Sequence, residues 1–211
     1  MVGLRALMIG VAGGSGSGKS LFARALAQRL QPRSVALLSE DDYYRRIDEP
    51  GFDPRVFDFD APSARDHAQL AGHLRRLRQG QAIERPVYSF RTHAPLKRLV
   101  PTAPAEVVIV EGLHVLHAAE VRAQLDFSVF LDVDGDIRFI RRLMRDIRQR
   151  GRSVQSVSQY LATVKPAHDR FVAPTRALAD LVLCFDAAEG GEDAILARWL
   201  DATHAALAAR L

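Results

Sequence analysis

The chain has 211 residues, of which 48% are hydrophobic and 26% charged, and these values are ordinary for a folded globular protein. The formal net charge of +4 favours anionic partners, either phosphate groups or nucleic acid. Because Cys184 is the single cysteine, no intrachain disulfide can form, and we expect a buried thiol in a reducing cytoplasm. No apolar run approaches the ~18 residues of a membrane span, and we interpret the apolar residues 4–11 as a buried strand rather than a signal peptide.

Short aliphatic runs alternate with helical patterns along the chain. We predict strands at residues 6–11, 34–38, 107–110, 127–131 and 181–185, and helices at residues 20–30, 63–79, 137–150, 154–164 and 194–211. This alternation predicts an α/β fold with a mostly parallel five-stranded sheet and helices on both faces. Residues 83–100 break the alternation and predict a small β-rich flap, and we expect residues 1–211 to form a single domain.

A glycine-rich segment follows the first predicted strand and opens the first predicted helix. It matches the pattern G-x-x-x-x-G-K-[ST] and consists of Gly13, Gly14, Ser15, Gly16, Ser17, Gly18, Lys19 and Ser20. In such a phosphate-binding loop (P-loop), backbone N–H groups and the helix N-terminus surround the phosphates. Lys19 is then expected to reach the β- and γ-phosphates, and the Ser20 hydroxyl is expected to bind Mg²⁺.

The P-loop predicts a nucleotide-binding site but does not identify the reaction. A GTPase needs an N-K-x-D segment, which a chain without asparagine cannot contain, and we interpret the D-x-x-G match at residues 132–135 as chance. Small-molecule kinases and divergent ATPases remain. A kinase needs a carboxylate near the acceptor hydroxyl. Asp41 follows the second predicted strand and Glu111 ends the third, at the carboxyl edge where ligands of such sheets bind.

Arginines are concentrated in the predicted helix at residues 137–150 and just beyond it. They are Arg138, Arg141, Arg142, Arg145, Arg148, Arg150 and Arg152. On its own, a run of this kind is typical of a solvated helix face. Arginine also forms bidentate contacts with phosphate, so a role at a nucleotide stays open.

Six further segments, together with the P-loop, carry a resemblance to a known family. The chain resembles the uridine kinase (uridine–cytidine kinase) family, within the wider group that includes phosphoribulokinase, through residues 13–20, 38–44, 59–64, 86–93, 110–112, 141–146 and 150–152. The resemblance implies a P-loop kinase that transfers the γ-phosphoryl of ATP (or GTP) to the 5′-hydroxyl of uridine or cytidine, with Mg²⁺ as cofactor. It also implies a homotetramer.

The same resemblance implies roles for individual residues. Asp41 would take the proton of the ribose hydroxyl, and Glu111, Ser20 and Asp41 would organise Mg²⁺. Lys19, Arg142 and Arg145 would be catalytic as well, with Lys19 and Arg145 at the phosphates and Arg142 on the acceptor side. The implied nucleoside pocket consists of Asp60 at the ribose diol with Tyr44, Tyr88, Phe90, His93, Arg142 and Arg152. Arg145, Arg150 and Arg152 would belong to a lid at about residues 142–165, which leaves Arg138, Arg141 and Arg148 on a solvated face.

The chain departs from the family pattern at several positions. Ser89, Ala61 and His114 replace residues that are usual in the family, and no Pro-Arg-Gly turn follows the fifth predicted strand. Two alternatives therefore stay open: a kinase of the same architecture for another sugar-like acceptor, and a non-catalytic module that binds nucleotide or nucleic acid. Asp41 and Glu111 beside the P-loop favour the kinase, with a small-molecule acceptor, no nucleic acid or membrane partner, and a cytoplasmic location.

Overall fold

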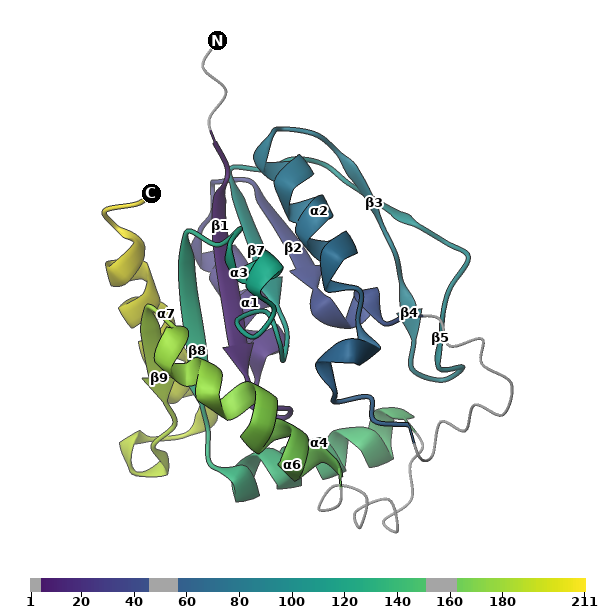
Figure 1. The fold of residues 1–211 in the computed structure, drawn as a ribbon. Helices are drawn as coiled ribbons and strands as arrows, with labels where there is room; N and C mark the ends of the chain where they lie inside the picture. Colours follow the sequence, from purple (N-terminus) through teal and green to yellow (C-terminus); the bar gives the residue numbers. More distant parts are fainter. Residues whose placement is uncertain (1–4, 46–56, 151–162) are drawn as a thin grey trace.

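A computed structural model describes residues 5–45, 57–150 and 163–211 (Figure 1). The helix predicted at residues 154–164 lies almost entirely outside the described residues. Among those residues, no helix combines the length and the apolar character needed to cross a membrane.

A five-stranded parallel sheet forms the centre of the structure, as predicted. Its strands are β1 (Leu7–Gly13), β2 (Val35–Ser39), β7 (Val107–Glu111), β8 (Phe127–Asp132) and β9 (Leu181–Cys184), in the order β2-β7-β1-β8-β9. Because all five strands run the same way, their carboxyl ends meet at one edge (Figure 1). The P-loop follows the central strand β1 at this edge.

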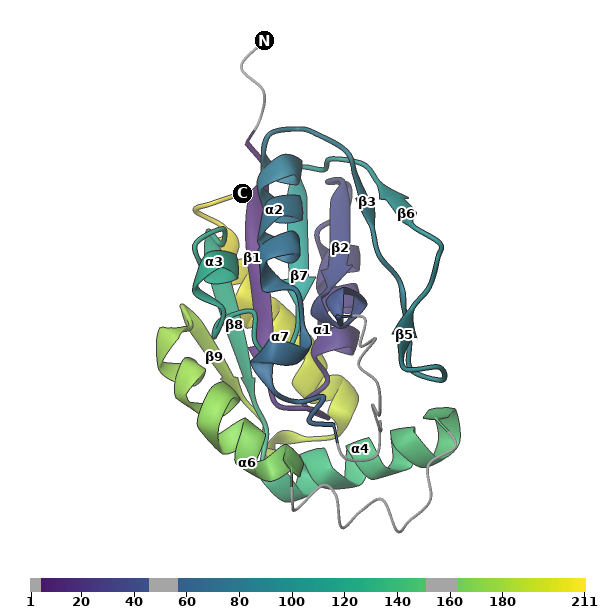
Figure 2. The ribbon, with the colours of Figure 1, turned by 45° about the vertical axis from the view of Figure 1, so that its right-hand side comes forward.

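Helices cover both faces of the sheet. The helices α1 (Lys19–Arg29) and α7 (Glu192–Leu207) cover one face, and α2 (His67–Arg78) and α3 (Ala119–Arg122) cover the other (Figure 2). Side chains of β1 alternate between these layers: Met8 packs in the core under α2, whereas Ile9 and Val11 pack against α1 and α7. A helical run made of α6 (Lys165–Ala167), a π-helical turn (His168–Val172) and a 3-10 helix (Ala173–Leu178) joins the α2 side.

Two further parts reach the carboxyl edge of the sheet. The helix α4 (Gly135–Arg150) crosses below the strand ends in Figure 2. The flap contains two short antiparallel pairs, β3 (Ile83–Arg85) with β6 (Val100–Thr102) and β4 (Tyr88–Ser89) with β5 (Ala94–Pro95), so its predicted β-rich character is correct.

The helix predicted at residues 63–79 begins later than expected. A 3-10 turn at Pro62–Ala64 is followed by Arg65 in an extended conformation, with φ −118° and ψ 153°, which bridges to Tyr44. The helix starts at His67 because the Asp66 side chain accepts the backbone N–H of Gln69 at 2.9 Å. Arg65 thereby becomes part of a loop rather than a helix.

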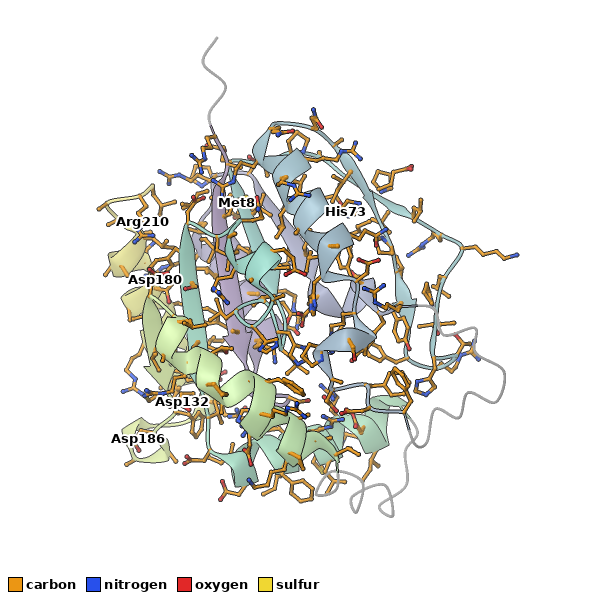
Figure 3. All side chains as sticks on the ribbon, viewed as in Figure 1. Met8, His73, Asp132, Asp180, Asp186 and Arg210 are labelled. Atoms are coloured by element: carbon orange, nitrogen blue, oxygen red, sulfur yellow. The ribbon has the colours of Figure 1, made fainter. Side chains whose placement is uncertain are left out.

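One expectation about a polar side chain is wrong. Cys184 is exposed, not buried, because it is the last residue of the edge strand β9, beyond the helix that covers Leu183. Asp132, labelled in Figure 3, ends the neighbouring strand β8, where it accepts a hydrogen bond of 2.8 Å from Arg176 Nε. This contact gives Asp132 a partner within the fold, and Asp132 does not line the pocket described below.

Candidate active site

A pocket of about 280 Å³ opens at the carboxyl edge of the sheet. Its phosphate side is formed by the loop and first turn of α1, and its far side by the flap, α4 and the segment before α2. The predicted residues that line it are Ser15, Gly16, Gly18, Lys19, Ser20, Asp41, Tyr44, Asp60, Tyr88, Phe90, His93, Glu111, Arg142 and Arg145. The fold therefore brings together residues that are separated by more than a hundred positions in the sequence.

The other predicted site residues either lie beside the pocket or fall outside the residues that the structure describes. Gly13, Gly14 and Ser17 belong to the P-loop but not to the lining. The side chain of Arg150 and the whole of Arg152 lie outside the described residues. Their implied places in the lid stay predictions.

The P-loop takes its shape from glycines at positions that other residues rarely occupy. Gly16 has a φ of +83°, and a Cβ there would lie 2.3 Å from the backbone oxygen of Arg138. Gly18, with a φ of +93°, immediately precedes the first turn of α1. The loop thus wraps back over the start of α4 and presents the N-terminus of α1 to the pocket.

Lys19 and Glu111 are two buried charged residues on the phosphate side of the pocket. The Lys19 ammonium donates to the Gly14 carbonyl at 3.0 Å, and burial lowers its pKa against the attraction of Glu111. Burial likewise raises the pKa of the Glu111 carboxyl, and Lys19 opposes that change. Glu111 Oε1 accepts hydrogen bonds from Ser20 and Ser39, each at 2.9 Å. These contacts place hydroxyl and carboxylate oxygens together beside the P-loop.

Asp41 lies at the junction between the two sides of the pocket. It belongs to a short 3-10 turn, Glu40–Tyr43, that follows β2 and is capped by the Ser39 hydroxyl. Its Oδ1 accepts a hydrogen bond of 3.0 Å from Arg65 Nη2, and its side chain keeps 40% exposure toward the pocket. A carboxylate in this position can accept a proton from a hydroxyl bound in the pocket.

Asp60 and Arg142 form a direct ion pair in the lining of the pocket. The two guanidinium nitrogens of Arg142 each donate to a different oxygen of Asp60 at 3.3 Å. Burial disfavours the charge of Asp60, but Arg142 outweighs it and lowers the pKa of the carboxyl. Asp60 does not cap the helix that follows, because Asp66 does so. Its carboxylate is therefore ionised and directed into the pocket.

Aromatic rings form the wall next to Asp60. Tyr44 packs on Tyr88 with a centroid distance of 4.7 Å and meets Phe90 edge-on at 6.2 Å. Phe59 extends this wall to His93, whose ring centroid is 5.0 Å away. Flat apolar faces with a few polar groups are suited to a planar base and its sugar.

The arginines of α4 divide differently from the expectation. Arg145 lines the pocket and is held by Asp146 at 3.0 Å, and Arg148 is exposed as expected. The expectation of a solvated face is wrong for Arg138 and Arg141. Arg138 is buried against the P-loop and donates to the Val133 carbonyl at 2.8 Å, because α4 passes directly beneath that loop. Arg141 lines the pocket and lies over the ring of Phe185.

Sequence reasoning missed a group of ionisable residues that are packed together behind the pocket. Arg65 lines the pocket wall, and Glu40, His67 and His114 surround it in the interior. Burial opposes the charge of Glu40, yet its hydrogen bond with His67 and the charge of Arg65 lower its pKa to about 2. A sequence signal existed for part of this arrangement, since Asp66 with Gln69 forms a helix-capping pattern that leaves Arg65 outside the helix.

Comparison with known proteins gives consistent matches. Residues 8–185 match the model of the Phosphoribulokinase / Uridine kinase family. The chain is 42% identical over 192 residues to a uridine kinase of Lactobacillus johnsonii, covering 90% of this chain and 89% of that protein. It is 37% identical over 194 residues to a uridine kinase of Clostridium novyi, covering 91% of each.

Among solved structures, phosphoribulokinase from Rhodobacter spheroides superimposes with a TM-score of 0.65 at 15% identity, over 85% of this chain and 70% of that one. Identity this low shows a shared fold. The family model, by contrast, spans most of the sequence, and the two uridine kinases match it nearly from end to end. The chain therefore belongs to the Phosphoribulokinase / Uridine kinase family.

Proposed function

We propose that the chain is a uridine kinase, which transfers the γ-phosphoryl group of ATP (or GTP) to the 5′-hydroxyl of uridine or cytidine to give UMP or CMP. The observation that carries this proposal is the union of two half-sites in one pocket: Lys19 and Ser20 on the phosphate side, and Asp41, Asp60 and the aromatic wall on the other. Relatives named uridine kinase at about 40% identity support the same acceptor.

The acceptor side of the pocket suits a ribonucleoside. The base would lie against Tyr44, Tyr88 and Phe90, with His93 at its edge. The ionised Asp60 would accept hydrogen bonds from the ribose diol, with Arg142 holding its orientation. This placement directs the 5′-hydroxyl toward Asp41, which would take its proton during transfer.

The donor side of the pocket suits a nucleoside triphosphate with Mg²⁺. Ser20, Glu111 and Asp41 supply only oxygen ligands, the donor set that this hard cation prefers. When bound, Mg²⁺ neutralises developing charge on the phosphates. Lys19 would contact the β- and γ-phosphates, and Arg145 would stabilise the equatorial oxygens of the phosphoryl group in flight.

The lid would close over the phosphates and exclude water, so that the hydroxyl of the nucleoside rather than water is phosphorylated. Arg150 and Arg152 would join Arg145 there, with Arg152 also on the substrate side.

We propose that residues 1–211 act as one kinase domain, that four copies assemble as a homotetramer, and that the enzyme acts in the cytoplasm.

An acceptor screen tests the proposed function. The purified chain is incubated with ATP and Mg²⁺ and with uridine, cytidine, their 2′-deoxy forms, adenosine or simple sugars, and ADP formation is measured. We expect ADP formation to depend on uridine or cytidine, with a 5′-monophosphate identified by mass spectrometry. Turnover of a sugar but of no nucleoside would assign a different acceptor, and binding of ATP without turnover of any acceptor would favour a non-catalytic module.

A further inference from the structure

Four ionisable side chains are packed in the interior behind the pocket. Glu40 and Arg65 are fully buried as side chains, and His67 and His114 are 9% and 0% exposed. They come from the turn after β2, the loop before α2, the start of α2 and the segment after β7. Burying charge is costly unless each group finds partners, so the arrangement of these partners is informative.

The group has the residue types of a metal site but is already occupied by a cation. In the described part of the chain, one ligand atom each from Glu40, His67 and His114 lies within 4.8 Å of the others. Arg65 Nε, however, lies 3.5 Å from Glu40 Oε2, and Arg65 Nη1 lies 3.4 Å from His114 Nδ1. A guanidinium is always charged and only donates hydrogen bonds. A divalent cation would meet this charge at contact distance, so the cluster is an ion-pair network centred on Arg65.

The other side of the same guanidinium faces the pocket. Arg65 Nη2 donates to Asp41 Oδ1 at 3.0 Å and to the Tyr44 hydroxyl at 2.6 Å. Arg65 Nη1 donates to the Phe59 carbonyl at 3.1 Å, and the Tyr44 hydroxyl donates to the same carbonyl at 2.9 Å. One planar group therefore links the residue expected to act as base, the aromatic wall and the loop that carries Asp60.

We propose that Arg65, anchored from behind by Glu40, is a positioning residue that orients Asp41 and Tyr44 for phosphoryl transfer to the nucleoside. This proposal rests on the proposed function. Arg65 holds one oxygen of Asp41 and leaves the second available to the hydroxyl of the acceptor. The planar guanidinium is fixed by Asp41, Tyr44, the Phe59 carbonyl and Glu40. It therefore also fixes the orientation of the Tyr44 ring within the aromatic wall.

The experiment compares Arg65→Met, which keeps the bulk of the side chain but removes its charge and donors, with Arg65→Lys, which keeps a cation. Arg78→Met serves as the matched control, because Arg78 makes a comparable ion pair of 3.0 Å with Asp126 but does not line the pocket. For each variant, kcat, the KM for uridine, the dissociation constant for ATP and the folded fraction are measured.

We expect Arg65→Met to lower kcat at least about tenfold and to raise the KM for uridine, since charge-assisted hydrogen bonds to Asp41 and Tyr44 are lost. Affinity for ATP should stay within about twofold, because Arg65 forms its hydrogen bonds and ion pairs with residues outside the P-loop in the described part of the chain. Arg65→Lys should recover part of kcat, and Arg78→Met should keep both kinetic constants.

Three outcomes would overturn the inference. They are wild-type kinetics in folded Arg65→Met, a loss of kcat that only follows the folded fraction with an unchanged KM, and identical kinetics of the Lys and Met variants. Should Arg65→Met fail to fold, Glu40→Gln weakens the anchor and must lower kcat with the same pattern. If the wild-type chain does not phosphorylate uridine, the proposed function fails, and the variants are then compared on the acceptor that the screen identifies.

Discussion

The Asp60 carboxylate offers the most direct test of whether the acceptor is a ribonucleoside. Each oxygen of the Asp60 carboxylate accepts one hydrogen bond from an Arg142 nitrogen 3.3 Å away. Each oxygen therefore keeps a lone pair that can accept a hydrogen bond from one of two neighbouring ribose hydroxyls. A 2′-deoxyribose lacks one of these donors. A hydrogen bond to a charged group contributes about 1.5–3 kcal/mol, so uridine should exceed 2′-deoxyuridine in kcat/KM by about 10- to 150-fold.

Replacing Asp60 should remove both the preference and most of the activity. In Asp60→Ala, Arg142 keeps Asp146 as a partner, with Nε and Oδ2 3.6 Å apart, so we expect the fold to persist. Asp126→Ala is the control, because Asp126 binds the backbone N–H of Met8 at 2.9 Å at the opposite edge of the sheet (Figure 3 labels Met8). This control should keep the ratio between the two nucleosides.

The assay is a pair of kcat/KM measurements, with uridine and with 2′-deoxyuridine, for the wild-type chain and both variants. Equal values for the two nucleosides in the wild-type chain would refute the diol assignment. A preference that survives in folded Asp60→Ala would place the recognition of the 2′-hydroxyl on another residue.

Three further predictions address the base, the lid and the buried cluster. Asp41→Asn should lower kcat at least about 100-fold with ATP affinity little changed, and near-normal turnover would remove Asp41 from the mechanism. Arg145→Ala should lower kcat more than it raises the KM for uridine, because the cation acts mainly on the transition state; a pure KM effect would contradict this. Burial lowers the pKa of His114 to about 4 against the attraction of Glu40, from an ordinary value of 6.5. Since the unfolded chain binds this proton more readily, the free energy of unfolding should fall as the pH drops from 6.5 toward 4, and His114→Gln should flatten that fall in urea titrations.

The sheet and the P-loop could be predicted because their signals are local. Each central strand is a short aliphatic run covered on both faces, and the pattern from Gly13 to Ser20 specifies a loop between a strand and a helix. Glu111 could be predicted as a site residue for a similar reason, since it ends a buried strand at the edge of the sheet where ligands bind.

The cluster around Arg65 could not be predicted because it depends on contacts between distant segments. Its members come from positions 40, 65, 67 and 114, and no spacing in the sequence relates them. Pro62 stands where a helix can begin and so favoured a start at residue 63, whereas Pro62 begins a separate 3-10 turn and Asp66 caps the helix that starts at His67. The exposure of Cys184 was missed for a related reason, since an aliphatic run does not reveal that its strand lies at the edge of the sheet.

The charges that line the pocket are arranged for an anionic ligand. Among the described residues, the lining carries three carboxylates, Asp41, Asp60 and Glu111, and five cationic groups, Lys19, Arg65, Arg141, Arg142 and Arg145. Counted over the lining alone, cationic groups outnumber carboxylates, while Glu40, Asp146 and Glu192 outside the lining pair with Arg65, Arg145 and Arg141. A magnesium–triphosphate complex is anionic, and Lys19 and Arg145 would be the cations that face its phosphates. The neutral nucleoside needs no such compensation: the aromatic wall would bind its base, and the Asp60 carboxylate would bind its ribose hydroxyls.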